Sequence, residues 1–460
     1  MKRYKLLGLV LVLALLVMAG DACIGSLTVS GDGATGRPAD DPALSARALC
    51  PRLPPPSGPT VHVSSVSELS DAVNDATTGT TILVADGTYH LDGTYLWVDT
   101  PGVTLRSASG NREAVVLDGD YVTTEIVQVV ASDVTIADVT LREAYTHPIH
   151  VMSSEGGDTT GTLIYNVHIV DPREQAIKIN PAAEGYYPDY GEIACSHIEL
   201  TDAGRPHVNP ISGGCYTGGV DAHQARGWRI RDNLITGFWC PSGLSEHAIH
   251  LWRGCRDPVV ERNTLRNNAR GVGFGLATSG DGRTYSDDPC PGASGYVDHY
   301  GGVIRNNAVF ANDSDLFGSD DGFDCGICLW NACSVRVLHN TVASTQAPYS
   351  SIESRFANTD PQLINNLVTH NLRERDGATV YSSGNLTGVS LSLFANGAGG
   401  DLHLAPTAVG AIDQVAAPGD VVDDIDGDSR PIGSASDIGA DEYREPAAHA
   451  IFLPLVLRAH

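Results

Sequence analysis

One pattern of hydrophobic and polar positions returns along the chain: a short aliphatic stretch ends in Asn or Asp, and another aliphatic residue soon follows. Repeats that recur irregularly, about every 20 to 50 residues, are typical of solenoids. The asparagines are expected at the bends, because Asn tolerates left-handed backbone geometry and bonds its own backbone. The copies are Trp228–Ile235, Val259–Leu265, Val303–Val309, Val335–Val342 and Leu363–Val368, with weaker ones at Val134–Leu141 and Ile164–Ile169.

The stretch before the repeats predicts a helix and then a strand. Ser65 and Glu68 have the spacing of a capping box, which predicts a helix over Val66–Ala76, and a strand and turn follow at Thr81–Tyr89. This order resembles the N-terminal cap of right-handed parallel β-helix proteins of the pectate-lyase-like superfamily. Such a cap is needed because the open end of a solenoid exposes core and unpaired backbone. The predicted fold class is all-β: a single-stranded right-handed parallel β-helix with an N-terminal helical cap.

The chain divides into five predicted regions. They are a signal peptide (1–22), a mobile Pro/Gly-rich linker (23–60), the β-helix (61–400), a closing segment (401–445) and a hydrophobic tail (446–460). The tail resembles sorting or anchoring tails of exported bacterial proteins. We therefore expect a secreted or cell-surface protein, with lipidation at Cys23 or the C-terminal tail as its routes to a membrane.

Charge and cysteine content narrow the class of partner. The formal charge is −26, from 29 basic and 55 acidic side chains, which disfavours nucleic acid and anionic membranes. Residues 226–270 hold eight arginines, which predict a local basic patch able to offset this field for a polyanionic glycan. Ten cysteines in an exported chain predict disulfides, with the pairing open. Cys325 and Cys328 are alternatively a metal-binding pair.

Aligning the repeats on their asparagines stacks residues that are far apart in sequence. Strand side chains alternate, so aliphatic residues of each coil should point inward and the next residue outward, about 4.8 Å from its neighbour. The inward positions are Ile126, Ile149, Ile177, Val220, Ile249, Val272, Ile327 and Ile352. One outward column is His150, Lys178, Asp221, His250, Gly273, Cys328 and Glu353. The second is Met152, Asn180, His223, Trp252, Gly275, Trp330 and Arg355.

These columns combine titratable groups with tryptophan, which suits a polysaccharide site. Tryptophan on an exposed strand stacks on a sugar ring, and the gap at Gly273 and Gly275 lets a ligand approach the backbone. The predicted catalytic residues are Lys178, Asp221, His223 and His250. The predicted substrate-binding residues are Trp252, Trp330, Arg253, Asn180, Glu353 and Arg355, and no residue is predicted to bind a metal within the columns.

The segment Gly219–His223 resembles the Tyr-Gly-Phe-Asp-Pro-His-Asp motif of mannuronan C5-epimerases, with Asp221 and His223 at the matching Asp and His. The resemblance implies that Lys178 corresponds to the lysine that this family carries on an earlier coil. The segment departs from the motif at Gly218, which stands in place of the tyrosine, and further at Ala222 and Gln224, which replace the proline and the final aspartate.

The chemistry expected of these residues is that of a uronate-directed lyase or C5-epimerase, which abstracts the proton next to a carboxylate. In this hypothesis His223 or His250 is the base, Lys178 neutralises the carboxylate, and Asp221 orients a histidine. The predicted partner is an extracellular polysaccharide, bound by a monomer.

Other function classes stay open. A β-helix also serves as a non-catalytic glycan-binding protein or adhesin, since a fold does not fix a function. A glycoside hydrolase would need two carboxyls at hydrolytic separation. Its candidates are Asp221, Glu246, Asp324 and Glu353. No cofactor is certain; calcium is the alternative at Asp424, Asp426 and Asp428, where a structural turn is the preferred interpretation.

Overall fold

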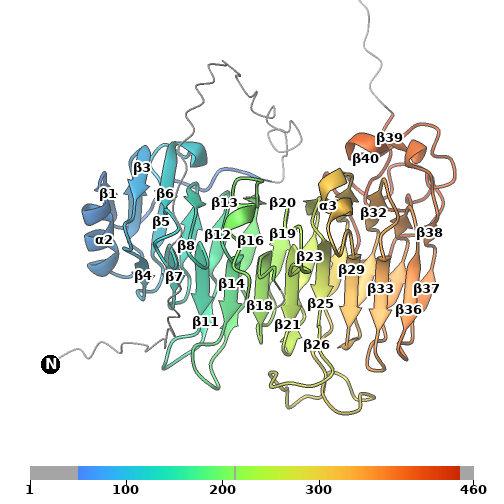
Figure 1. The fold of residues 1–460 in the computed structure, drawn as a ribbon, viewed down its shortest axis with the longest axis horizontal. Helices are drawn as coiled ribbons and strands as arrows, with labels where there is room; N and C mark the ends of the chain where they lie inside the picture. The colour runs from blue at the N-terminus through green and yellow to red at the C-terminus, as the bar shows by residue number, and fades with distance from the viewer. Residues whose placement is uncertain (1–49, 212–213, 446–460) are drawn as a thin grey trace, which may run out of the picture. The chain divides into compact units, whose positions relative to one another are not determined.

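The chain winds into stacked coils, and their strands form three long parallel sheets (Figure 1). Consecutive strands of each sheet come from consecutive coils. The computed structural model describes residues 50–211 and 214–445. One coil, for example, supplies β18 (Gly218–His223), β19 (Arg229–Arg231) and β20 (Leu234–Thr236), one to each sheet. Neighbouring coils pair in parallel. The architecture confirms the predicted right-handed parallel β-helix.

The strands of the three sheets are short and follow one another in chain order. Sheet A contains β1 Thr60–Val63, β2 Thr81–Val84, β5 Thr104–Ser107, β8 Thr135–Ala137, β12 Leu163–Tyr165, β16 Glu192–Ala194, β19, β23 Val259–Glu261, β27 Val303–Arg305, β31 Arg336–Leu338, β34 Gln362–Ile364 and β37 Tyr381–Ser383. Sheet B contains β3 Gly87–His90, β6 Val115–Asp118, β9 Thr140–Arg142, β13 His168–Val170, β17 His197–Glu199, β20, β24 Thr264–Arg266, β28 Ala308–Ala311, β32 Thr341–Ser344, β35 Leu367–Val368 and β38 Leu386–Thr387. Sheet C contains β4 Leu96–Val98, β7 Val127–Val129, β10 Ile149–Met152, β14 Gln175–Asn180, β18, β21 Ile249–Trp252, β25 Arg270–Phe274, β29 Cys325–Trp330, β33 Ser350–Arg355 and β36 Leu372–Arg375.

Smaller elements decorate the coils. Among the described residues the helical turns are α2 Val66–Asn74, α3 Ser314–Gly318, η1 Arg112–Ala114, η2 Arg205–His207, η3 Leu391–Leu393 and η4 Gly397–Gly399. The remaining strands are β11 Thr159–Thr160 with β15 Pro188–Asp189, β22 Cys255–Arg256 with β26 His299–Tyr300 and β30 Ala332–Cys333, and the antiparallel pair β39 Phe394–Asn396 and β40 Asp401–Leu404. No helix within the described ranges is both long and apolar enough to span a membrane.

The interior is a column of aliphatic side chains in the predicted register of sheet C. Val220 pairs with Ile177 on one side and Ile249 on the other, and the same alignment continues through Val272 to Ile352. All of these side chains are fully buried. The prediction slips at the earliest coil, where Val127 rather than Ile126 pairs with Ile149.

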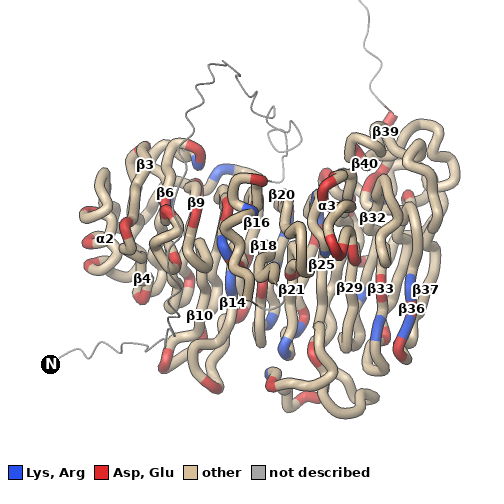
Figure 2. The backbone as a smooth tube through the Cα atoms, viewed as in Figure 1, with Lys and Arg blue, Asp and Glu red and all other residues tan. Residues whose placement is uncertain are grey.

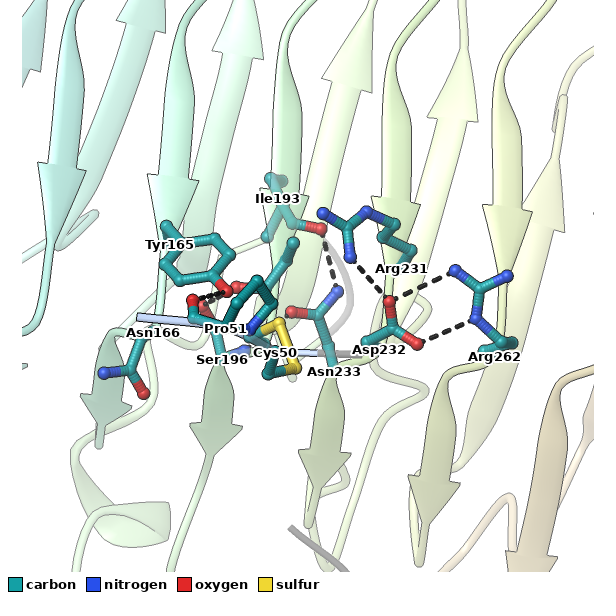
Figure 3. Close-up of a disulfide and its surroundings, with 12 residues drawn as sticks. Cys50, Pro51, Tyr165, Asn166, Ile193, Ser196, Arg231, Asp232, Asn233 and Arg262 are labelled. Atoms are coloured by element: carbon teal, nitrogen blue, oxygen red, sulfur yellow. Dashed lines mark hydrogen bonds and ion pairs between the residues drawn. A yellow bond between two sulfur atoms is a disulfide. The ribbon is translucent and has the colours of Figure 1, made fainter. Parts of the chain in front are cut away.

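The asparagines of the repeat form a buried ladder at the corner between sheets A and B. Each Nδ2 donates to the Oδ1 of the next coil's asparagine, at 2.9 to 3.0 Å, and also to a backbone carbonyl of the preceding coil, as Asn233 does to Ile193 (Figure 3). The ladder runs through Asn233, Asn263, Asn307, Asn340, Asn366 and Asn385.

The asparagines of the ladder do not adopt the left-handed geometry predicted for them. The residue before each one does: Asp232, Arg262 and Asn306 have φ values of 56°, 52° and 54°. The bend is therefore made by the preceding residue, and the amide is left free to bridge coils.

Helix α2 lies at the N-terminal end of the stack (Figure 1). The Ser65 side chain accepts a hydrogen bond from the Glu68 N–H (3.3 Å), and the Glu68 carboxylate accepts one from the Ser64 N–H (2.7 Å). The helix ends at Asn74 instead of the predicted Ala76. Its Leu69 and Val73 side chains join the main core, since one face of the short helix is apolar.

The C-terminal part of the predicted linker is attached to sheet A. Cys50 forms a disulfide with Cys195, and the Tyr165 hydroxyl donates a hydrogen bond to the Pro51 carbonyl (Figure 3). Arg106 donates to the carbonyl of Pro54 at 3.0 Å. These contacts hold residues 50–54 in place, contrary to a mobile linker. The signal peptide, Cys23, the rest of the linker and the hydrophobic tail lie outside the described residues.

The closing segment packs its apolar residues against sheet B, where they form a second small core with Ala308, Phe310, Ala343 and Leu367. The hairpin of β39 and β40 crosses the boundary predicted at residue 400. The Asp424 carboxylate accepts hydrogen bonds from the N–H groups of Asp426, Asp428 and Glu442. Asp424 thus closes a turn with its own backbone, as in the preferred interpretation of this acidic run.

Replacing Asn307 by alanine is expected to lower the free energy of unfolding by about 2 to 4 kcal/mol, because buried groups on both neighbouring coils lose their partners. Asn385→Ala is the control: its coil is the last of the ladder, so we expect a loss of only about 1 kcal/mol. Urea unfolding of the full chain measures both. Equal losses for the two variants would contradict the ladder's role.

Candidate functional site

The outer face of sheet C carries the predicted columns in the predicted register. His150 pairs with Lys178, Lys178 with Asp221, and Asp221 with His250. The row continues through Gly273 and Cys328 to Glu353, and in the second row Met152 pairs with Asn180, His223 with Trp252 and Trp330 with Arg355. The predicted pairing is therefore present, but most of the paired side chains are buried.

Lys178, Asp221 and His223 form one cluster across β14 and β18. Lys178 Nζ donates a hydrogen bond to Asp221 Oδ2 and lies 3.1 Å from His223 Nε2. His223 Nε2 is also 3.2 Å from Asp221 Oδ2. Lys178 and Asp221 are buried, whereas 14% of the His223 side chain is exposed. His223 is thus the member that a ligand reaches first.

The charges of this cluster follow from its burial and its pairing. Burial acts to lower the pKa of Lys178, but Asp221, together with Tyr216 and Glu246, raises the lysine pKa above its ordinary value. Burial acts to raise the pKa of Asp221, yet His223 and Lys178 hold it well below its usual range. Burial lowers the pKa of His223 despite the nearby carboxylate. A neutral imidazole therefore lies beside a fixed ammonium–carboxylate pair.

Trp252 and Arg253 border the cluster on the next coil. Trp252 Nε1 donates a hydrogen bond to Asp221 Oδ1 (2.8 Å), and its ring meets the His223 ring edge-on at 4.7 Å. The exposed Arg253 guanidinium lies 4.9 Å from the centre of the Trp252 ring. No carboxylate of the described residues pairs with Arg253. It is therefore a cation available to a ligand beside His223.

His250, a predicted catalytic residue, does not face solvent. Its side chain is fully buried, and its Nδ1 lies 3.0 Å from Glu246 Oε2. The gap expected at Gly273 is filled by the His247 imidazole, because a Cβ on Gly273 would lie 2.5 Å from His247 Nε2. The glycine therefore accommodates a histidine of the same protein, and the notion of a ligand entering there is wrong.

Trp330 and Glu353 are buried too, contrary to the exposed positions predicted for them. Trp330 Nε1 and Arg375 Nη2 each donate to Glu353 Oε1 at 2.8 Å, and Ser350 Oγ donates to Oε2 at 2.8 Å. The indole therefore shields a fully bonded carboxylate. Arg355 pairs with Asp376 at 2.6 Å.

Asn180 contacts His150, which lies on the preceding coil of sheet C. Its Oδ1 lies 2.7 Å from His150 Nε2, and the other nitrogen of that ring lies 2.7 Å from Glu125 Oε1. Asn180 and His150 are both partly exposed. These two residues extend the polar face from Lys178 toward the N-terminal end of sheet C.

Two loops flank the cluster. The loop over residues 201–217 is joined to the next coil by the Cys215–Cys240 disulfide, and Asn209 Nδ2 donates to Glu174 Oε1 at 2.8 Å. Tyr216 lies near the end of this loop, two residues before β18. Burial raises the pKa of Tyr216, while Lys178 acts to lower it. Its phenol therefore stays protonated at neutral pH.

The second loop, over residues 276–298, lies against Arg253. Its Arg283 N–H donates to the Arg253 carbonyl (3.0 Å), and Asp298 accepts from the Arg253 N–H (2.8 Å). Arg283 also reaches across to Asp189 at 2.8 Å. These contacts hold the second loop beside Arg253.

The arginine-rich stretch is not a patch. Arg229 and Arg231 lie on sheet A, Arg266 on sheet B and Arg270 on sheet C. Most of these arginines pair with acidic residues, as Arg229 does with Glu261. Figure 2 shows basic positions on β14 and at the lower ends of β21, β33 and β36 instead, scattered among acidic ones. The basic character near the cluster is therefore local, from Lys178 and Arg253.

Sequence reasoning missed Tyr216 and His247, and weighed Glu246 only as a hydrolase carboxylate. Tyr216 is two residues before the position where the epimerase motif has its tyrosine. It lies in a loop, outside the aligned strand positions, so the alignment of the coils did not include it. Glu246 and His250 are four residues apart, with His247 between them. That spacing is the sequence feature that could have indicated a cluster of Glu246, His247 and His250.

The structure pairs eight cysteines and leaves Cys255 as a buried free thiol among the described residues. Cys325 and Cys328 are bonded to each other, so the alternative of a metal pair does not hold here. Cys290 bonds to Cys333 and fixes the 276–298 loop to the coil of β30.

No protein-family model matches the sequence, and no curated protein sequence matches it either. Among solved structures the chain is similar to an alginate lyase from Paenibacillus sp. str. FPU-7 (14% identity, TM-score 0.48, 71% of this chain and 98% of that one). It is similar to pectate lyase Pel9A (15%, 0.49, 84% and 97%) and to the tailspike protein of E. coli bacteriophage HK620 (13%, 0.46, 73% and 59%). Likeness at this level does not assign a substrate or a reaction to this chain.

Lys178→Met is expected to cost about 3 to 5 kcal/mol of stability, because it leaves the buried Asp221 carboxylate without its cation. Adding Asp221→Leu should recover more than half of that loss, since both charges are then gone. Urea unfolding of the two single variants and the double variant measures the coupling. Additive losses would show that the two side chains do not act as a pair.

Proposed function

We propose that this protein acts on an extracellular uronate-containing polysaccharide, by lyase or C5-epimerase chemistry. The observation that carries the proposal is the contact of Lys178, Asp221 and His223, with the exposed Arg253 beside it. Such a reaction needs a positioned base and a cation that stabilises the developing carboxylate dianion. The cluster supplies both within two neighbouring coils.

His223 is the base in this proposal. Its lowered pKa keeps the imidazole neutral, and it is the most exposed member of the cluster. In the resting protein Lys178 donates to His223 Nε2, so this nitrogen holds the lone pair. For catalysis the Lys178 N–H must leave Nε2, which then accepts the proton at C5 of the uronate, while Lys178 keeps its hydrogen bond to Asp221 Oδ2.

Arg253 and Trp252 bind the sugar. The Arg253 guanidinium forms a bidentate pair with the uronate carboxylate, which withdraws charge as the C5 proton leaves. The partly exposed Trp252 offers an apolar edge to the ring of the sugar. Its indole N–H stays on Asp221, so binding does not disturb the ion pair.

Tyr216 is the proton donor. A lyase uses it to protonate the leaving oxygen, and an epimerase uses it to return a proton to the opposite face of C5. Its raised pKa keeps the phenol protonated until it is needed. The two outcomes differ in product: an unsaturated sugar with a new chain end, or an intact chain with inverted C5.

The disulfides support an oxidising, extracellular location.

Polysaccharide binding without turnover is the second candidate. The burial of Lys178 and Asp221 favours it, because a structural ion pair needs no access to ligand. In that case Arg253 and Trp252 alone contact the glycan.

The test incubates the full chain with alginate, polygalacturonate, glucuronan and a neutral glucan. Ultraviolet absorbance detects unsaturated products, and proton NMR detects epimerised residues. We expect His223→Gln to lower kcat/KM by at least about 100-fold, the usual contribution of a general base. His62→Gln, at an exposed position of β1, is the control and should leave the rate unchanged. Tight binding without any product would instead establish the binding function.

The acid side of the pH profile gives a separate prediction. The base must be neutral, so kcat/KM should fall as the pH drops through the lowered pKa of His223, with a midpoint below about 6.5. Asp221→Asn removes a carboxylate that acts to raise the pKa of this imidazole, and should move the midpoint to still lower pH. A midpoint above about 6.5, or one that this variant leaves in place, would argue against His223 as the base.

A further inference from the structure

We propose that Glu246, His247 and His250 form a binding site for a first-row transition-metal ion such as zinc. The proposal does not rest on the polysaccharide chemistry, because it concerns a side-chain cluster on the N-terminal side of β21 and on β21 itself. One carboxylate and two imidazoles are a donor set that such ions prefer.

The three side chains have the spacing of metal ligands. Each offers an atom within 4.8 Å of the others. Glu246 Oε2 lies 3.0 Å from His250 Nδ1 and 4.0 Å from His247 Nδ1. Ligand atoms around a tetrahedral zinc ion lie about 3.3 Å apart, given zinc–ligand bonds of about 2.0 to 2.2 Å. The separations in the cluster, from 3.0 Å to no more than 4.8 Å, bracket that value.

The donor atoms of the cluster lack other partners. His247 is fully buried, and neither of its ring nitrogens makes a hydrogen bond. His250 Nδ1 and Glu246 Oε2 are also buried without a hydrogen bond that meets the usual geometry. A buried polar atom without a partner costs about 1 to 3 kcal/mol, so several in one place call for an explanation. A bound cation satisfies one nitrogen of His247 together with His250 Nδ1 and Glu246 Oε2.

Other histidine–carboxylate clusters of the described chain do not share this property. In the cluster of His168, His197 and Glu199, both ring nitrogens of His168 contact glutamates. His403 likewise contacts aspartates through both nitrogens. Across the described residues, the buried histidine nitrogens that lack a hydrogen bond belong to His247 and His250 alone.

Glu246 is the most exposed of the three side chains. His247 and His250 are fully buried, whereas 21% of the Glu246 side chain is exposed. The ion therefore enters from the Glu246 side, where water completes a four-coordinate shell. Two imidazoles and one carboxylate do not suit calcium, which takes six to eight oxygen ligands.

The solenoid itself supplies the matched control. Strand pairing aligns His250 with Asp221 and Asp221 with Lys178, so Glu174 stands two coils earlier at the position of Glu246. Glu174 also lies near a buried histidine, His147, at 3.6 Å. Its own coil, however, carries Gln175 and Lys178 at the positions of His247 and His250. Glu174 therefore occupies the position equivalent to Glu246, but its coil lacks the two histidine ligands.

The experiment uses the full chain, purified without a histidine tag, stripped with a chelator and dialysed. Zinc is titrated by calorimetry, cobalt(II) is added as a visible-light probe, and bound metal is counted by mass spectrometry. We expect one ion per chain and tetrahedral cobalt absorption. His247→Gln and Glu246→Gln should each weaken zinc binding by at least about tenfold, since even outer-shell changes cost that much. Glu174→Gln should bind like the wild type.

Circular dichroism of each variant checks that the fold is intact, and Glu246→Gln is the decisive variant because it keeps the shape of the side chain. Absence of stoichiometric zinc in the wild type would overturn the proposal. So would binding that Glu246→Gln leaves unchanged, or that Glu174→Gln weakens equally, because the ion would then lie elsewhere.

Discussion

The hydrogen-bonded asparagine ladder is the interaction on which the rest of the structure depends. Each amide bridges its own coil, the coil before and the coil after, so a coil that slipped by one residue would leave buried amides unpaired. The ladder therefore fixes the register of the second half of the stack from Asn233 onward. It does so at one corner, and the parallel strands transmit that register to the opposite sheet, where Asp221 and His250 lie on the first two coils of the ladder.

Register is what brings the site together. Lys178 and Asp221 are 43 residues apart in sequence, yet they pair directly because their strands are neighbours in sheet C. The intervening loop does not disturb this contact, since it leaves from the ends of the strands. A solenoid thus separates two tasks: the repeat places the side chains, and the loops decide which of them remain accessible.

That separation explains what the sequence could and could not predict. The alternation of strand residues and the asparagine spacing gave the fold and the pairing of His250 with Asp221. They could not give burial, because burial depends on the loops, which carry no repeat. Gly273 shows the limit most clearly: its missing side chain is a gap on the strand, but a histidine from outside the aligned columns fills it.

Asp221 connects the two clusters of the face. Its Oδ2 holds Lys178 and lies beside His223, while its Oδ1 accepts from Trp252 and lies 3.8 Å from His250 Nδ1. A carboxylate with cationic or donor groups on both sides stays ionised and does not move, because each oxygen is held from a different coil. A cation bound between Glu246 and His250 would add positive charge on the Oδ1 side. The charge of the Lys178–His223 cluster and the binding of a cation at Glu246, His247 and His250 are therefore linked through one buried carboxylate, Asp221.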